Sequence, residues 1–120
     1  MLNLDTHIVV ALLSGELTKA EENAIVGDSL AISDIVLWEL AKLVELGRLD
    51  LNMDDVEFRS FLRNSTIFPI TPEIAIQSTE LDFKSDPADE IIAATSVVEK
   101  IPLITRDRRI RKTKMVKFAG

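Results

Sequence analysis

An α/β fold built on a parallel sheet is the class that this sequence predicts. Short apolar segments of strand length alternate with longer segments whose apolar residues recur at helical spacing, which is typical of parallel βα units. Acidic residues follow several of the short segments. The 120 residues suffice for one domain with a hydrophobic core but not for two, so we expect a single domain over 1–120.

The first half of the chain contains clear helix boundaries. Gly15 ends the first helix, and Thr18 with Glu21 forms a capping box that opens the second. Ser33 or Asp34 caps the third helix. The expected elements are a strand over 1–4, helices over 6–14 and 18–28, a strand over 29–33 and a helix over 34–47.

The second half continues the alternation, with prolines as boundaries. Pro69 places its strand at a sheet edge or ends it, because proline has no N–H to donate. Pro72 and Pro87 stand at the first positions of two helices, where the missing N–H costs nothing. The expected elements are a helix over 52–64, a strand over 66–70, helices over 72–83 and 87–100, and strands over 102–105 and 115–118.

Composition excludes several kinds of protein. The chain has no cysteine, which excludes disulfide scaffolds and Cys-ligated zinc, and the single histidine, His7, cannot build a His-rich zinc site. No apolar run approaches the roughly 20 residues of a membrane span. The N-terminus lacks the basic start of a signal peptide. We therefore expect a cytoplasmic protein without membrane contact.

Charge is distributed unevenly along the chain. The net charge is −6, yet seven of the 14 basic residues fall within 106–120, where Asp107 is the only acid. The acidic balance elsewhere argues against general coating of nucleic acid. The basic segment is either a solvated terminal segment or a local contact for phosphates.

Four acids lie where a parallel α/β sheet forms its sites, beyond the carboxyl ends of the strands. Asp5 follows the first strand, Asp107 follows the strand over 102–105, and Asp86 and Asp89 open the helix that feeds that strand. Each has a structural alternative. Asp5 and Asp86 are suited to capping helices, Asp89 to the helix dipole and Asp107 to a turn. The predicted fold nevertheless brings most of these acids to one edge of one sheet.

Glu39 lies on the core-facing side of its helix. On a helical wheel it falls within the apolar stripe that includes Val36 and Leu40, whereas Trp38 falls on the polar side. A carboxylate on such a stripe needs a partner or a cation. The alternative is a residue at the edge of the stripe that reaches solvent or pairs with a lysine.

Clustered carboxylates favour a divalent cation. Two like charges about 4 Å apart repel by roughly 4 kcal/mol at an effective dielectric constant of about 20. A cluster is therefore tolerated only with protonation or a bound cation, and oxygen ligands suit Mg²⁺ or Mn²⁺. No Gly-rich phosphate loop and no local Ser-His-Asp set is present. Carboxylates with such a metal favour hydrolysis at phosphorus.

The segments "NLDTHIVVALL", "ISDIVLWELAKLVELGRL" and "DPADEIIAATSVVEKIPLITRDRRI" occur in an order that resembles the PIN domain, in particular the VapC-type toxins of toxin–antitoxin pairs. The resemblance covers nearly the whole chain. It implies a three-layer α/β/α sandwich around a mainly parallel five-stranded sheet. It also implies a metal-dependent endoribonuclease that acts on RNA.

The resemblance also implies roles for individual residues. Asp5, Glu39, Asp89 and Asp107 match the acids of the family, and Mg²⁺ or Mn²⁺ would be held by Asp5, Asp89 and Asp107. The remaining expected site residues are Asp86 and Thr105 as auxiliary groups, and Arg106, Arg108 and Arg109 as contacts for RNA phosphates.

A partner is implied as well, because an active ribonuclease toxin requires a cognate antitoxin. Trp38 on the polar helix face is expected at a protein interface, either with the antitoxin or within a homodimer. Its alternative is burial under a neighbouring helix of the same chain. The competing function is a PIN-like binding or scaffolding domain without catalysis, although such domains usually lose the acids that this chain keeps.

Overall fold

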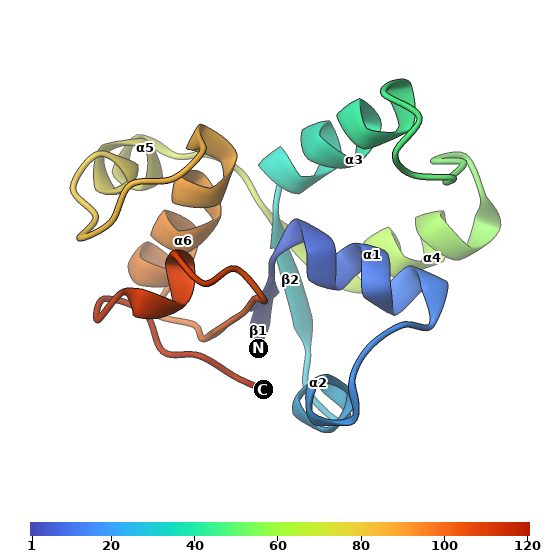
Figure 1. The fold of residues 1–120 in the computed structure, drawn as a ribbon, viewed down its shortest axis with the longest axis horizontal. Helices are drawn as coiled ribbons and strands as arrows, with labels where there is room; N and C mark the ends of the chain where they lie inside the picture. Colours follow the sequence, from blue (N-terminus) through green and yellow to red (C-terminus); the bar gives the residue numbers. More distant parts are fainter.

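A four-stranded parallel sheet occupies the centre of the computed structural model, which describes residues 1–120 (Figure 1). The strands are β1 (Leu2–Leu4), β2 (Leu30–Ser33), β3 (Ser65–Phe68) and β4 (Leu103–Ile104). Their order in the sheet is β3-β2-β1-β4, and every neighbouring pair is parallel. The expected α/β class is confirmed, and β3 lies at an edge and ends before Pro69.

Helices cover both faces of the sheet. In Figure 1, α5 and α6 lie to the left of β1 and β2, whereas α1, α3 and α4 lie to the right. The helices are α1 (Thr6–Ser14), α2 (Lys19–Ile25), α3 (Ile35–Glu45), α4 (Val56–Arg63), α5 (Pro72–Ser78) and α6 (Pro87–Glu99), followed by the short 3₁₀ helix η1 (Ile110–Lys112). No helix is both long and apolar enough to cross a membrane.

The helix boundaries follow local sequence signals. Gly15 ends α1 with a left-handed backbone at φ 71°, which glycine adopts without steric cost. Thr18 and Glu21 form the expected capping box of α2. Pro72 and Pro87 begin α5 and α6. These signals therefore placed one end of each of four helices.

The buried strand β1 is fastened to helix α6 by a polar contact. The side-chain amide of Asn3 donates hydrogen bonds to the carbonyl oxygen of Ile92, at 3.0 Å, and to the hydroxyl of Ser96, at 2.9 Å. All three residues are buried. This contact fixes the strand that carries Asp5 against the helix that carries Asp89.

Several expected elements differ from the structure. The helices expected over 18–28 and 52–64 are shorter, at Lys19–Ile25 and Val56–Arg63. The fifth strand, expected over 115–118, is reduced to a single bridge between Leu103 and Phe118, because β4 is only two residues long and offers no longer ladder. The helix expected over 72–83 ends at Ser78. The Thr79 hydroxyl bonds back to the Ile76 carbonyl, and the chain then turns so that Leu81 and Phe83 pack on the core.

Candidate active site

Acids from four separate segments meet at the carboxyl edge of the sheet. Asp5 follows β1 directly, and Asp107 lies three residues beyond β4. Glu39 lies in α3, which leaves the sheet after β2, and Asp89 lies in the first turn of α6. Because all strands are parallel, their carboxyl ends lie on the same side of the sheet. The expected convergence of these segments is therefore present.

Asp5 is the most buried acid of this group, with 2% of its surface exposed. One carboxylate oxygen accepts the Thr6 backbone N–H at 2.8 Å, so the helix-capping alternative also holds. The other oxygen accepts a hydrogen bond from the Thr105 hydroxyl. Burial raises the pKa of Asp5, these hydrogen bonds oppose the rise, and the charge of Asp107 adds slightly to it.

Glu39 and Asp89 are both partly buried near other acids. Burial is the main cause that raises the pKa of each carboxyl, and the charges of neighbouring acids raise both further. Glu39 accepts a hydrogen bond from the Thr6 hydroxyl, and Asp89 accepts one from the Ser85 hydroxyl at 2.8 Å. The three carboxyl groups at positions 5, 39 and 89 therefore share one environment that disfavours negative charge.

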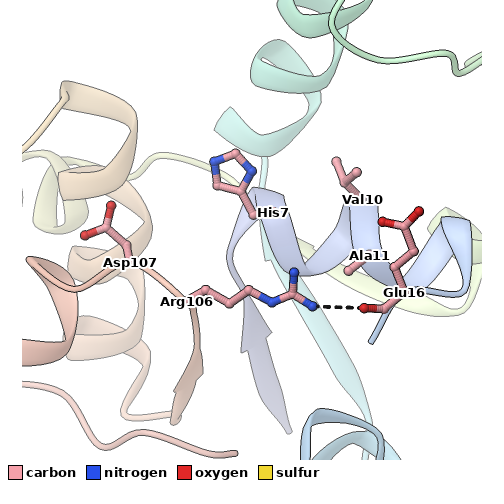
Figure 2. A pocket seen from close by; sticks show the side chains of 6 residues that line it. All are labelled: His7, Val10, Ala11, Glu16, Arg106 and Asp107. Atoms are coloured by element: carbon pink, nitrogen blue, oxygen red, sulfur yellow. Dashed lines mark hydrogen bonds between the residues drawn. The ribbon is translucent and has the colours of Figure 1, made fainter. Parts of the chain in front are cut away.

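Asp107 faces both the site and a turn. Its carboxylate accepts the backbone N–H groups of Arg109, at 2.8 Å, and of Ile110, at 3.1 Å. Ile110 is the first residue of η1. The backbone N–H of Asp107 donates to the Thr105 hydroxyl at 3.0 Å. Asp107 also lines a pocket of about 290 Å³ with His7, Val10 and Ala11 of α1, Glu16 and Arg106 (Figure 2).

The other expected site residues occupy less enclosed positions. Asp86 is exposed at the N-cap of α6, and its side chain forms no capping hydrogen bond. Arg108 and Arg109 are exposed, and neither forms an ion pair. Arg106 differs from them, because its guanidinium pairs with Glu21 of α2.

The donors at this edge match a hydrated divalent cation better than a cage of protein ligands. No three carboxylate or imidazole side chains stand close enough together to enclose one metal ion. Mg²⁺, however, keeps several waters and is usually held through one or two carboxylates, and Mn²⁺ shares this preference for oxygen. The carboxylates of buried Asp5 and of partly buried Glu39 and Asp89 are oxygen ligands of the required kind, and the raised pKa values of these groups show that a nearby cation would be favourable.

Helix α3 presents Glu39 and Trp38 to different surroundings. Glu39 is partly buried toward the site, as the helical wheel predicts. Trp38 remains 54% exposed, so no neighbouring helix covers it and the alternative of burial within the chain is wrong.

Three residues that support the site were not predicted from the sequence. Thr6 and Ser85 donate hydroxyl hydrogen bonds to Glu39 and Asp89, and Glu21 holds Arg106. Thr6 contacts a residue 33 positions away and Glu21 one 85 positions away, and no local spacing signals such contacts. Glu21 was visible only as part of a capping box.

Comparison with solved structures places the fold among toxin–antitoxin proteins. The chain resembles a protein in a toxin–antitoxin complex from Klebsiella pneumoniae, with a TM-score of 0.74, 24% identity and coverage of 97% of this chain and 95% of the other. It also resembles a chain of VapBC2 from Rickettsia felis bound to a promoter DNA fragment, with a TM-score of 0.71, 20% identity and coverage of 98% and 97%. At these sequence identities the likeness shows a shared fold only.

Sequence comparison identifies the family. Ribonuclease VapC22 of Mycobacterium tuberculosis is 32% identical over 117 residues, which cover 90% of this chain and 88% of the relative. The model of the PIN domain family matches residues 3–115. The expected resemblance to VapC-type proteins is thereby confirmed, and the chain belongs to the PIN domain family.

Proposed function

We propose that this protein is a metal-dependent endoribonuclease and the toxin of a VapBC-type toxin–antitoxin pair, acting in the cytoplasm. The observation that carries the proposal is the group formed by Asp5, Glu39 and Asp89, whose pKa values are all raised by burial and by neighbouring acids at the carboxyl edge of the sheet. The ribonuclease relative VapC22 supports the choice of RNA as substrate.

Mg²⁺ or Mn²⁺ would be held by Asp5, Asp89 and Asp107, in part through water. Such a cation, when bound, polarises the phosphate and lowers the pKa of water. Glu39 completes the acidic group and orients water through its free carboxylate oxygen. Thr105 fixes the carboxylate of Asp5 by a hydrogen bond.

The residues around this group would bind the RNA backbone. Arg108 and Arg109 are exposed beside Asp107 and are free to contact phosphates that flank the cleaved bond. Asp86 is exposed one helical turn before Asp89 and serves as an auxiliary acid.

A cognate antitoxin would restrain this activity. The structural neighbours occur in toxin–antitoxin complexes, and α3 offers an exposed Trp38 as an anchor for a partner. We propose that the chain binds such an antitoxin and forms a homodimer, with Trp38 in one of these interfaces.

Cleavage of labelled single-stranded RNA tests the catalytic proposal. Highly purified protein is assayed with Mg²⁺, with Mn²⁺ and with EDTA. Internal cleavage with either metal and none with EDTA is expected. A folded protein that binds RNA but cleaves none under any of these conditions would instead favour the binding or scaffolding function.

A further inference from the structure

Glu21 is the only acid besides Asp5 that the fold buries. Its carboxylate accepts two hydrogen bonds from Arg106, from Nε at 2.8 Å and from Nη2 at 2.7 Å. This two-pronged geometry is the strongest form of an arginine–carboxylate contact. The hydrogen bonds from Arg106 are the main cause that lowers the pKa of Glu21 to about 2, so the pair stays charged at neutral pH.

The Arg106 guanidinium is held at a third point. Its Nη2 also donates to the backbone carbonyl of Glu16 at 3.1 Å, drawn as the dashed line in Figure 2. The side chain therefore connects the segment after β4 to the loop before α2 and to α2 itself. The Glu21 carboxylate neutralises the charge of the Arg106 guanidinium and occupies its Nε and Nη2 donors. Arg106 is therefore a weaker contact for RNA phosphates than Arg108 and Arg109, which form no ion pair.

Arg106 stands between two residues of the candidate active site. Thr105 donates its hydroxyl hydrogen bond to Asp5 and accepts the backbone N–H of Asp107. These residues lie beyond the end of β4, where no strand ladder holds the chain. The segment is also held by Arg111, whose side chain donates to the Thr105 carbonyl at 2.9 Å and whose backbone N–H donates to the Asp107 carbonyl at 3.0 Å, and by the turn in which the Asp107 carboxylate accepts two backbone N–H groups. None of these contacts ties the segment to α2, which only the Arg106 side chain does. Fixing the Arg106 side chain therefore limits the movement of both neighbours.

We infer that Glu21 is a positioning residue, which holds Arg106 and thereby keeps Thr105 and Asp107 in the place where they serve the acidic site. The inference rests on the proposed function, since it concerns the same site. In this proposal Arg106 holds the segment in place and does not bind RNA.

The two possible tasks of Arg106 predict opposite results for Glu21→Gln. Glutamine keeps the capping hydrogen bond with the Thr18 N–H but removes the charge that binds Arg106. If Glu21 positions the segment, Mn²⁺ binding and kcat fall while KM for RNA is unchanged. If Arg106 binds phosphates, its release strengthens RNA binding and KM falls.

The experiment measures Mn²⁺ affinity by calorimetry without RNA, and kcat and KM with a labelled single-stranded RNA. For Glu21→Gln we expect Mn²⁺ affinity and kcat to fall about tenfold or more, the scale observed when residues that orient metal ligands are removed. Arg106→Lys keeps a positive charge but loses the fork, and it should show the same losses. It also serves as the second variant if Glu21→Gln does not fold.

Thr18→Ala is the matched control, because it removes the other half of the capping box and leaves the Glu21–Arg106 pair intact. It should lower the melting temperature without changing Mn²⁺ affinity or kcat. Wild-type values for both Glu21→Gln and Arg106→Lys, a lower KM for Glu21→Gln, or equal losses in Thr18→Ala would each overturn the inference. Absence of Mn²⁺ binding and RNA cleavage in the wild-type protein would instead reject the proposed function.

Discussion

At the scale of single residues, the acids at the sheet edge cost the folded state stability. Burial is the main reason that the pKa values of Asp5, Glu39 and Asp89 are raised, and neighbouring acids add to the rise. Proteins retain such groups at functional sites, where the charges are required for chemistry.

Asp89→Asn should therefore separate stability from activity. The amide keeps a hydrogen bond with Ser85 and removes one repelling charge, so the melting temperature in EDTA should rise by a few degrees. RNA cleavage should be abolished, because a ligand of the proposed cation is lost. Differential scanning fluorimetry and an RNA cleavage assay measure the two effects. A variant that is less stable in EDTA, or that cleaves RNA like the wild type, contradicts this explanation.

Thr105→Val tests a residue that orients a ligand without carrying charge. Valine has a similar shape but cannot donate to Asp5 or accept the Asp107 N–H. We expect RNA cleavage to fall about 10–100-fold, as for other residues that support metal ligands. Thr105→Ser keeps the hydroxyl and should retain most of the activity. If valine and serine behave alike, the hydrogen bonds of Thr105 do not matter for activity.

Single residues also mark the limit of prediction from this sequence. The partly buried position of Glu39 was predictable, because the residue falls within the apolar stripe of its helix. A carboxylate there lowers stability unless it has a polar partner or a cation. The hydrogen bond that Glu39 accepts from the Thr6 hydroxyl was not predictable, because these residues are 33 positions apart and only the fold brings them together. Ser85 is only four positions from Asp89, but a serine before a helix gives no sign of which acid it will contact. The pairing of Arg106 with Glu21 was not predictable either, because it depends on how segments 85 positions apart pack together.

At the scale of elements, helix α3 has two faces with different surroundings. It directs Glu39 toward the site and leaves Trp38 54% exposed. A partner that covers the outer face would therefore lie close to the helix that carries a site residue. Such an arrangement would couple partner binding to the active site without any change of fold.

Trp38→Ala should weaken a protein interface. An exposed tryptophan that anchors a partner contributes more than about 1 kcal/mol to binding. Sedimentation measures homodimer formation, and titration calorimetry measures affinity for the antitoxin. Ala41→Ser, on an exposed position of the same helix, is the control and should change neither. Unchanged dimerisation and unchanged antitoxin affinity in folded Trp38→Ala would eliminate the proposed anchor.

Among the elements, those with strong boundary signals were predicted well. Helix α6 begins at the expected Pro87, and helix α2 has its expected capping box. The strand expected over 115–118 was wrong, because the apolar residues of this segment find only a two-residue partner in β4 and form a single bridge with it. The length of a strand depends on its neighbour in the sheet, which local sequence does not contain.

At the scale of the whole molecule, stability without metal should depend on pH in two opposing ways. The pKa values of Asp5, Glu39 and Asp89 are raised in the folded state, so the protonated forms of these groups stabilise the fold at low pH. This stabilisation is lost as the pH rises through the raised pKa values. Glu21 acts oppositely. Its contribution is complete above the ordinary value of 4.5 and is lost as pH falls toward its pKa of about 2.

Added Mn²⁺ should therefore stabilise the protein near pH 7 and have little effect near pH 4. At pH 7 the carboxylates are more fully ionised, so a bound cation relieves both repulsion and desolvation. Near pH 4 the carboxyl groups with raised pKa values hold protons and bind the cation poorly. Melting curves with and without Mn²⁺ at the two pH values measure the difference. An equal shift at both would indicate binding elsewhere on the protein.

The central claim is that acids from four segments form one metal-dependent centre for RNA cleavage. The most direct measurement pairs Mn²⁺ calorimetry with RNA cleavage for the wild type, Asp89→Asn and Asp86→Asn, because the last removes an exposed acid only three positions away. We predict that the wild type binds Mn²⁺ and cleaves RNA, that Asp89→Asn loses both properties and that Asp86→Asn, which removes only an auxiliary acid, reduces each far less than Asp89→Asn does. Equal Mn²⁺ affinity and equal cleavage in the wild type and Asp89→Asn would contradict the claim.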